Sequence, residues 1–292
     1  MKRLKARLGG EGIIVAPGVY DGLSALIAEQ AGAEAIYLSG ASLAYTRFGR
    51  PDIGLVSMSE VADAVAVICD RVALPLIVDG NTGFGNALNV QRTVRMFERM
   101  GAAAIQLEDQ TMPKRCGHLN GKSLISTGEM MGKIKAATDA RTADDFVVVA
   151  RTDAIGVEGF EAALDRAAAY AEAGADMVFV EAPRSLDEMK QIVATLGERV
   201  PLMANMVEGG KTPPMTARDL EALGFSLVIF PGGLTRAVAK ISRAYFDSLL
   251  KSGSNAPFRD QMYDFAGINA VVGTDDLLEA GNAYDEKRFT ND

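Results

Sequence analysis

One pattern recurs eight times along the chain: a short apolar run, a loop, and an alanine-rich amphipathic stretch. The runs are apolar throughout rather than alternating, which is typical of strands buried on both faces of a parallel sheet. The eight predicted strands cover residues 13–16, 35–38, 76–78, 104–107, 146–150, 177–180, 202–204 and 227–230.

Apolar residues at three- and four-residue spacing predict a helix between successive runs. These helices cover about 22–31, 58–70, 89–100, 127–139, 159–173, 185–196, 216–223 and 233–251, and several end in a glycine typical of a C-cap. Eight such units predict an α/β chain folded as a (β/α)8 TIM barrel. A doubly wound sheet is the alternative. It more often has five to seven strands and a glycine-rich fingerprint after the first strand, which this sequence lacks.

We expect the barrel to occupy residues 1–251 and a C-terminal helical extension to occupy residues 252–292. No low-complexity linker divides the chain. The extension is polar at both ends and carries apolar helical stretches near residues 263–272 and 276–283. Because it follows the eighth predicted helix, we expect it to pack on the outside of the barrel or on another subunit.

Composition excludes several classes of protein. The formal net charge of −8 argues against a nucleic-acid partner or an acidic membrane surface. No apolar run approaches the roughly 20 residues needed to cross a bilayer, and the basic N-terminus lacks the apolar region of a secretory signal. Two cysteines, Cys69 and Cys116, have no metal-site spacing, which favours a reducing cytoplasm over a disulfide framework.

Polar residues follow nearly every predicted strand, at the barrel end that carries the chemistry in folds of this type. Several oxygen donors around one point suit Mg2+ or Mn2+, and Arg151 has the geometry to clamp a substrate carboxylate. Each acid alone has a structural alternative as a helix cap or an ion-pair member, and we expect that role for Asp153 and Glu208. The polar residues at the strand ends are Ser39, Asp79, Asn81, Glu108, Asp109, Arg151, Asp153, Glu181, Asn205 and Glu208.

The segment Lys114-Arg115-Cys116-Gly117-His118 follows the fourth predicted strand, and His118 is the only histidine in the chain. A thiol beside Lys, Arg and His is biased toward the thiolate form, and the adjacent glycine leaves room for a substrate or for loop movement. Two interpretations are open from these residues alone. The segment is a reactive site on a mobile loop, or it is a solvated basic turn that contains a cysteine.

This segment, together with Gly121-Lys122, resembles the active-site loop of the isocitrate lyase and phosphoenolpyruvate mutase superfamily. The resemblance runs from about residue 10 to about residue 250, and the cysteine loop is similar to that of the carbon–carbon lyase branch. The further motifs that carry it are Tyr37-Leu38-Ser39-Gly40, Pro51-Asp52-Ile53-Gly54, Asp79-Gly80-Asn81-Thr82-Gly83-Phe84-Gly85, Glu108-Asp109-Gln110, Ala150-Arg151-Thr152-Asp153-Ala154, Glu181-Ala182 and Ala204-Asn205.

The resemblance implies a barrel whose last helix is exchanged between subunits of a homotetramer. It also implies Mg2+- or Mn2+-dependent retro-aldol or retro-Claisen cleavage of a hydroxy acid similar to 2-methylisocitrate or 2,3-dimethylmalate. One product would be a keto acid of the pyruvate or glyoxylate type. The other would be a carboxylic acid released through an aci-carboxylate intermediate.

Site residues follow from the resemblance by position. Asp79 would hold the metal directly, while Asp52 and Glu108 would hold its waters. Cys116 would donate the proton that the departing carbon takes up, with His118 beside it in the catalytic loop. The residues that would bind substrate are Ser39, Gly40, Ala41, Arg151, Glu181, Asn205 and Pro231.

Two positions bear on the choice of reaction within the superfamily. Asn81 stands where the family usually has an aspartate, so it could still hold a metal-bound water but adds no charge. Pro231 resembles the lyases, whereas the oxaloacetate-hydrolysing branch has serine there. The alternatives are an oxaloacetate-type hydrolase or decarboxylase, a phosphonopyruvate-processing enzyme, and a non-catalytic barrel that binds a dicarboxylate.

Overall fold

In the computed structural model, which describes residues 4–285 and 288–289, eight parallel strands close into a barrel in sequence order. This confirms the fold class predicted from the repeat. The strands are β1 (Ile14–Val19), β2 (Ile36–Leu38), β3 (Leu76–Asp79), β4 (Ala104–Glu108), β5 (Val147–Thr152), β6 (Met177–Val180), β7 (Leu202–Asn205) and β8 (Leu227–Phe230).

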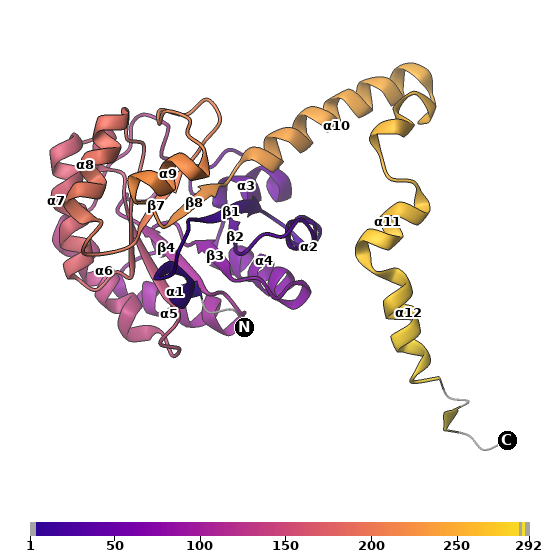
Figure 1. Cartoon of the computed structure of the whole chain (residues 1–292), viewed down its shortest axis with the longest axis horizontal. Helices are drawn as coiled ribbons and strands as arrows, with labels where there is room; N and C mark the ends of the chain where they lie inside the picture. The colour runs from indigo at the N-terminus through magenta and orange to yellow at the C-terminus, as the bar shows by residue number, and fades with distance from the viewer. Residues whose placement is uncertain (1–3, 286–287, 290–292) are drawn as a thin grey trace. The chain divides into compact units, whose positions relative to one another are not determined.

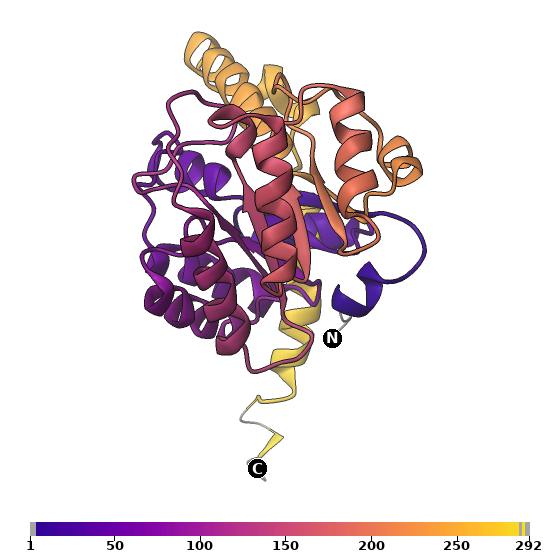
Figure 2. The ribbon, with the colours of Figure 1, turned by 90° about the vertical axis from the view of Figure 1, so that its left-hand side faces the viewer.

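Helices of the barrel lie around the outside of the strands (Figures 1 and 2). Short polar side chains cap most of them, as Asp21 does for α2 and Asn86 does for α5, and so supply acceptors for the free amides of the first turn. The helices of the first 235 residues are α1 (Leu4–Leu8), α2 (Gly22–Gln30), α3 (Gly40–Phe48), α4 (Met58–Arg71), α5 (Ala87–Arg99), α6 (Thr127–Ala140), α7 (Phe160–Glu172), α8 (Leu186–Leu196) and α9 (Ala217–Leu223), with a 3-10 turn at η1 (Ala154–Gly156).

Two of these helices are absent from the sequence-based prediction. Helix α1 has five residues, too few to show a periodic pattern. Helix α3 begins directly after β2 with small residues capped by Ser39, whose sequence shows no apolar period. The backbone amides of Gly40 and Ala41 therefore belong to the first turn of a helix.

The interior of the barrel is apolar at its amino end. Leu4 and Leu8 of α1 join a buried cluster with strand residues such as Ile14, Val147 and Leu227. Lys5 of the same helix pairs with Asp176 at 2.7 Å, just before β6. Helix α1 therefore closes this end of the barrel.

The barrel closes between β1 and β8, where Ile14 pairs with Leu227 and Pro17 with Phe230. A side-chain carbon at Gly18 would lie 2.2 Å from the carbonyl oxygen of Pro231, so only glycine allows this approach. The same Pro231 oxygen accepts a hydrogen bond from the Ser42 hydroxyl at 2.9 Å. The backbone at Pro231 thus ties β8 to β1 and α3.

The chain divides into two compact units, Met1–Thr235 and Arg236–Asp292. Helix α10 (Gly233–Ser252) crosses this division, and the second unit continues with η2 (Ala256–Gln261), α11 (Phe265–Val272) and α12 (Thr274–Asn282). Helices α11 and α12 have no buried residues. Within the described ranges, no helix is long and apolar enough to span a membrane.

Candidate active site

A cluster of buried charged side chains lies at the carboxyl ends of the strands. Arg151 at the end of β5 has Nη2 3.2 Å from Oε2 of Glu181 and Nη1 3.6 Å from Oε2 of Glu108. Asn205 at the end of β7 donates to Glu181 Oε2 at 3.1 Å. Four strands therefore bring one cation, two acids and one amide to a common point.

Glu108 is the most isolated acid of this cluster. Neither of its carboxylate oxygens has a hydrogen-bond partner among the described residues. Burial raises the pKa of its carboxyl to about 8, against the opposing charges of Lys114 and Arg151. A buried acceptor without a donor is costly, which makes this carboxylate available to a ligand.

Asp153 orients the Arg151 side chain through two hydrogen bonds. The guanidinium donates from Nε to Asp153 Oδ2 at 2.9 Å and from Nη2 to Oδ1 at 3.1 Å. Its Cζ also lies 5.3 Å from the ring centre of Phe179. Burial would raise the pKa of the Asp153 carboxyl, but the adjacent cations Arg151 and Lys122 lower it to about 2. Asp153 is therefore an anion at neutral pH.

Asp79 at the end of β3 contacts the first turn of α3. Its Oδ2 accepts from the Gly40 amide at 3.3 Å, and its Oδ1 accepts from the Asn81 amide at 3.1 Å. A side-chain carbon at Gly40 would lie 2.9 Å from Asp79 Oδ2, so the glycine permits the close approach. The free amides of a helix's first turn favour an anion. The N-terminus of α3 therefore adds donors to this rim.

The cysteine loop is held by residues outside the barrel strands. Lys114 Nζ lies 2.6 Å from Asp52 Oδ1, and both side chains are buried. The Cys116 amide donates to the Asp52 carbonyl at 3.2 Å. Gln110 completes the support, since its side-chain amide exchanges hydrogen bonds with both backbone groups of Arg115 at 2.8 and 2.9 Å.

The expected bias of Cys116 toward the thiolate is wrong for this structure. Burial raises the pKa of the thiol, and the backbone amide of His118 offsets only part of that rise. The cations next to Cys116 in sequence are directed elsewhere, because Lys114 pairs with Asp52 and Arg115 donates to the Asn120 carbonyl at 2.9 Å. At neutral pH the thiol keeps its proton, which suits an acid rather than a nucleophile.

His118 is positioned between two strand-end loops. Its Nδ1 accepts from the Lys211 amide at 3.1 Å, so in the neutral ring Nε2 carries the proton. That Nε2 lies 3.4 Å from Glu181 Oε1. Burial lowers the pKa of the imidazole, although Glu181 raises it in part. The neutral ring thus links the cysteine loop to the β6 and β7 ends.

Pro231 and Glu208 lie apart from these contacts. The Pro231 carbonyl lies at the junction of β8 with β1 and α3. A side-chain carbon at Gly233 would lie 2.9 Å from Glu208 Oε1, which places Glu208 beside the end of β8.

Sequence reasoning missed the pair Tyr37 and Gln106 inside the barrel, where the Tyr37 hydroxyl donates to Gln106 Oε1 at 3.1 Å. A glutamine inside the apolar run of β4 was the signal that could have revealed it.

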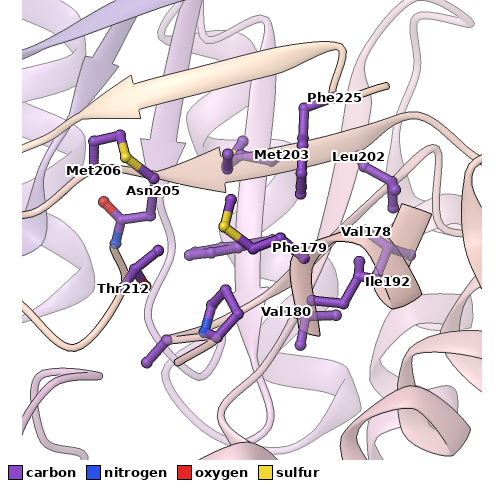
Figure 3. Close-up of a pocket in the computed structure, with 14 residues that line it drawn as sticks. Val178, Phe179, Val180, Ile192, Leu202, Met203, Asn205, Met206, Thr212 and Phe225 are labelled. Carbon is purple, nitrogen blue, oxygen red and sulfur yellow. The ribbon is translucent and has the colours of Figure 1, made fainter. Parts of the chain in front are cut away.

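A separate pocket lies between β6, β7 and α8 (Figure 3). It is lined mainly by apolar side chains, among them Phe179, Met203 and Ile192, with Asn205 and Thr212 on one side. Its volume of about 10 Å³ is close to that of one water molecule. It is too small for a substrate, so the charged rim remains the candidate site.

Residues 3–250 match the protein family described as phosphoenolpyruvate phosphomutase. The chain is 40% identical over 282 residues to 2,3-dimethylmalate lyase of Eubacterium barkeri, with 97% of each chain covered. The chain belongs to the phosphoenolpyruvate mutase and isocitrate lyase superfamily. It is an enzyme of this superfamily, whose named lyase relatives place it among the carbon–carbon lyases.

Other members of the superfamily show how its chemistry varies. A 2-methylisocitrate lyase of Aeropyrum pernix is 48% identical over 264 residues, which is 90% of this chain and 84% of that protein. The structure of oxaloacetate acetylhydrolase with the inhibitor 3,3-difluorooxalacetate has a TM-score of 0.90 at 36% identity, covering 97% and 96% of the chains. Phosphonopyruvate hydrolase with oxalate and Mg2+ has a TM-score of 0.86 at 34% identity, covering 97% of each chain.

Proposed function

We propose that this enzyme is a Mg2+- or Mn2+-dependent lyase that cleaves a hydroxy acid similar to 2-methylisocitrate or 2,3-dimethylmalate. The products are a keto acid of the pyruvate or glyoxylate type and a carboxylic acid. The observation that carries the proposal is the position of the cysteine loop against Arg151 and Glu181. A side-chain carbon at Gly117 would lie 2.4 Å from Arg151 Nη2 and 2.6 Å from Glu181 Cγ, so the segment holding Cys116 packs directly on the charged cluster.

The residues present fit a divalent cation. The Glu108 carboxylate is buried without a hydrogen-bond donor, and Asp79 presents a second buried carboxylate at the same rim. Among residues 4–285 and 288–289, no three His, Cys, Asp or Glu side chains form a ligand cluster, and Mg2+ in proteins needs only one or two carboxylates because it keeps several waters. Asp79 would ligate directly, and Asp52, Glu108 and Asn81 would hold the waters. Once bound, the cation stabilises negative charge on substrate oxygens.

Substrate binding uses the donors of the same rim. Arg151 is fully charged and pre-oriented, so it binds the carboxylate or oxyanion of the keto-acid part. Ser39, Gly40 and Ala41 form the cap and first turn of α3 beside that part, where the Ser39 hydroxyl and the Ala41 amide would donate to it while the Gly40 amide donates to Asp79. Glu181 and Asn205 contact the far end of the substrate.

The substrate hydroxyl loses its proton to Glu108, directly or through a water, and the carbon–carbon bond breaks as the carbonyl of the keto acid forms. Burial raises the pKa of the Glu108 carboxyl to about 8, and a divalent cation at this rim would favour the ionised carboxylate that this step requires. The bonding electrons pass to the other fragment as an aci-carboxylate. The buried, protonated Cys116 then gives its proton to that carbon, while neutral His118 holds the loop against Glu181.

We also propose that the enzyme works as a homotetramer with exchanged C-terminal helices. In the barrel unit, a groove of about 470 Å³ runs along β1 and α2 and is lined by Val15, Ile27 and Leu234. In the C-terminal unit, Leu250 is 83% exposed and Phe265 is 86% exposed. An uncovered apolar groove and uncovered apolar helices suit pairing between copies. Light scattering of Leu250→Asp, which should yield a smaller species, tests this.

A substrate panel tests the lyase proposal. Purified enzyme with Mg2+ is mixed with 2-methylisocitrate, 2,3-dimethylmalate and related hydroxy acids, and pyruvate, glyoxylate and oxaloacetate are measured. We expect release of one keto acid at a rate far above that in excess chelator. Release of none from any member of the panel would end the proposal.

An oxaloacetate-type hydrolase, or a phosphonopyruvate enzyme, is the second candidate. It is favoured by the solved structures of such enzymes at 34–36% identity. Oxalate release from oxaloacetate and phosphorus NMR of phosphonopyruvate distinguish it from the lyase. Proline at 231 and the Cys116 loop favour the lyase over both.

A further inference from the structure

A buried ion pair lies between the cysteine loop and the base of the arginine site. Lys122 Nζ is 3.0 Å from Asp153 Oδ1, and the two side chains are 3% and 0% exposed. Neither residue belongs to the rim that faces substrate in the proposed mechanism. A fully buried ion pair costs desolvation, so its presence next to the site calls for a role.

One carboxylate serves both parts of the site. Asp153 accepts from Arg151 on both of its oxygens, and it accepts from Lys122 on Oδ1. The same Lys122 ammonium also donates to the carbonyl oxygen of Gly117, the residue that follows Cys116. A continuous path of charged hydrogen bonds therefore joins Arg151 to the backbone of the cysteine loop.

The base of this path is fixed to the barrel. Asp109 Oδ1 accepts from the Asp153 amide at 2.9 Å, and its Oδ2 accepts from the Thr152 hydroxyl at 2.7 Å. Tyr170 of α7 donates to the same Oδ2 at 2.8 Å. These bonds fix the backbone at Asp153, from which its carboxylate reaches both Arg151 and Lys122.

We propose that Asp153 and Lys122 are positioning residues that couple the closed cysteine loop to the orientation of Arg151. Asp153 orients the Arg151 guanidinium. Lys122 binds both the Asp153 carboxylate and the Gly117 carbonyl, so the position of the cysteine loop depends on the same carboxylate. Cys116 and Arg151 therefore reach their working geometry together. The inference rests on the proposed function for its kinetic consequence. Its structural part, the holding of the loop by Lys122, stands apart from any activity.

Alkylation of Cys116 measures the loop without substrate. Full-length enzyme is treated with iodoacetamide between pH 7 and 10, and modification of Cys116 and Cys69 is followed by peptide mass spectrometry. We expect Lys122→Met to speed Cys116 alkylation by roughly tenfold or more, because a charged hydrogen bond holding the loop is lost. Cys69, half-buried in α4, is the internal reference and should keep its rate.

Three variants make the test specific. Lys122→Arg keeps a charged donor and should restore much of the protection. Lys135→Met removes an exposed lysine that pairs with Asp139 on the same helix, away from the cysteine loop, so it should leave both cysteines unchanged. Asp153→Asn should free the loop as Lys122→Met does. It should also raise KM more than Lys122→Met does, because Asp153, unlike Lys122, hydrogen-bonds directly to Arg151.

Two results would overturn the proposal. One is unchanged Cys116 alkylation in both Lys122→Met and Asp153→Asn, since the loop would then not depend on the pair. The other is equal acceleration at Cys69 and Cys116, which would show general loosening of the barrel. Absence of lyase activity in the wild type would sink the proposed function and leave the alkylation result interpretable.

Discussion

The two ends of the barrel are built from the same eight strands but differ in what they bury. At the amino end, Leu4 and Leu8 of α1 are 3% and 7% exposed and pack on the first residues of the strands. At the carboxyl end, Arg151, Glu108 and Glu181 are buried within a few ångströms of one another. One end gains stability from apolar burial, and the other retains costly charges.

The two ends also differ in whether their buried polar atoms have hydrogen-bond or ion-pair partners. Near the amino end, Asp176 pairs with Lys5 and Arg141 and accepts from the Val148 amide. At or below the carboxyl rim, buried atoms without partners among the described residues include both Glu108 oxygens, Gln106 Nε2 and Asn205 Oδ1. The unpartnered side-chain atoms found among the described residues lie toward the carboxyl end, which indicates that ligands complete that end.

The largest effect that would sharpen this contrast comes from removing the thiol. Cys116→Ser should lower kcat/KM by about 10³-fold, the scale of a lost general acid, while the melting temperature stays close to that of the wild type. Steady-state kinetics and calorimetry measure the two quantities. Cys69→Ser is the matched control and should keep normal turnover. Appreciable turnover of Cys116→Ser would refute the acid role.

Metal removal tests whether the unpartnered carboxylates await a cation. EDTA should reduce the rate by roughly 100-fold or more, and added Mg2+ or Mn2+ should restore it, because charge on the substrate oxygens then loses its stabiliser. The rate is measured in chelator and after back-titration with each ion. Retention of the full rate in chelator would remove the metal from the scheme.

A change at the amino end should separate stability from turnover. Leu4→Ala should lower the free energy of unfolding by about 2–4 kcal/mol, and kcat should change less than twofold because α1 lies at the opposite end from the site. Urea unfolding and kinetics below the transition measure both. Leu4→Met, which keeps the volume, should be nearly neutral. A large loss of kcat in the folded Leu4→Ala enzyme would contradict the assignment of stability to the amino end and of turnover to the carboxyl end.

Asn81 allows the charge of the carboxyl end to be changed by one unit. Asn81→Asp should lower the Mg2+ concentration for half-maximal rate by about 3- to 10-fold, since it adds an anion near the proposed cation. Aspartate tolerates the left-handed backbone, at φ 49°, that Asn81 adopts. Asn81→Gly is the uncharged comparison, because glycine also adopts this backbone conformation without strain. An unchanged or weaker Mg2+ dependence in Asn81→Asp would argue against a metal at this position.

The smallest expected effect is a displacement of the pH profile. An acid works while it is protonated, and burial raises the pKa of the Cys116 thiol. The basic limb of kcat/KM should therefore fall above the usual thiol value of about 8.5, so activity persists to higher pH than an exposed cysteine would allow. A profile from pH 6 to 10 measures it. A limb at or below 8.5 would contradict the buried, protonated thiol.

The sequence predicted the eight strands of the barrel well, because uniformly apolar runs separated by amphipathic helices admit few other folds, but it missed the five-residue α1 that closes the amino end. It also indicated the strand-end acids, since their positions follow from where each run stops. It misjudged Cys116, because neighbours in sequence proved not to be neighbours in space. Lys114 turns to Asp52, a residue more than sixty positions away along the chain.

Helix α3 and the Lys122–Asp153 pair illustrate what the sequence could not provide. The first turn of α3 consists of small residues with no apolar period, so only the cap at Ser39 marks it. Asp153 was assigned a purely structural role, because a strand-end acid next to an arginine suggests a simple ion pair. Its second contact, to Lys122, depends on how a long loop folds back.

The backbone at Asn81 also limits how this enzyme can diversify. A side chain in the left-handed region there must be Asn, Asp or Gly to avoid strain. Asparagine and aspartate differ at that point in charge and barely in shape. The backbone at this position therefore favours a short list of residues, yet that list includes a pair that differs by one charge, so a single substitution could change the charge of this rim without altering the fold.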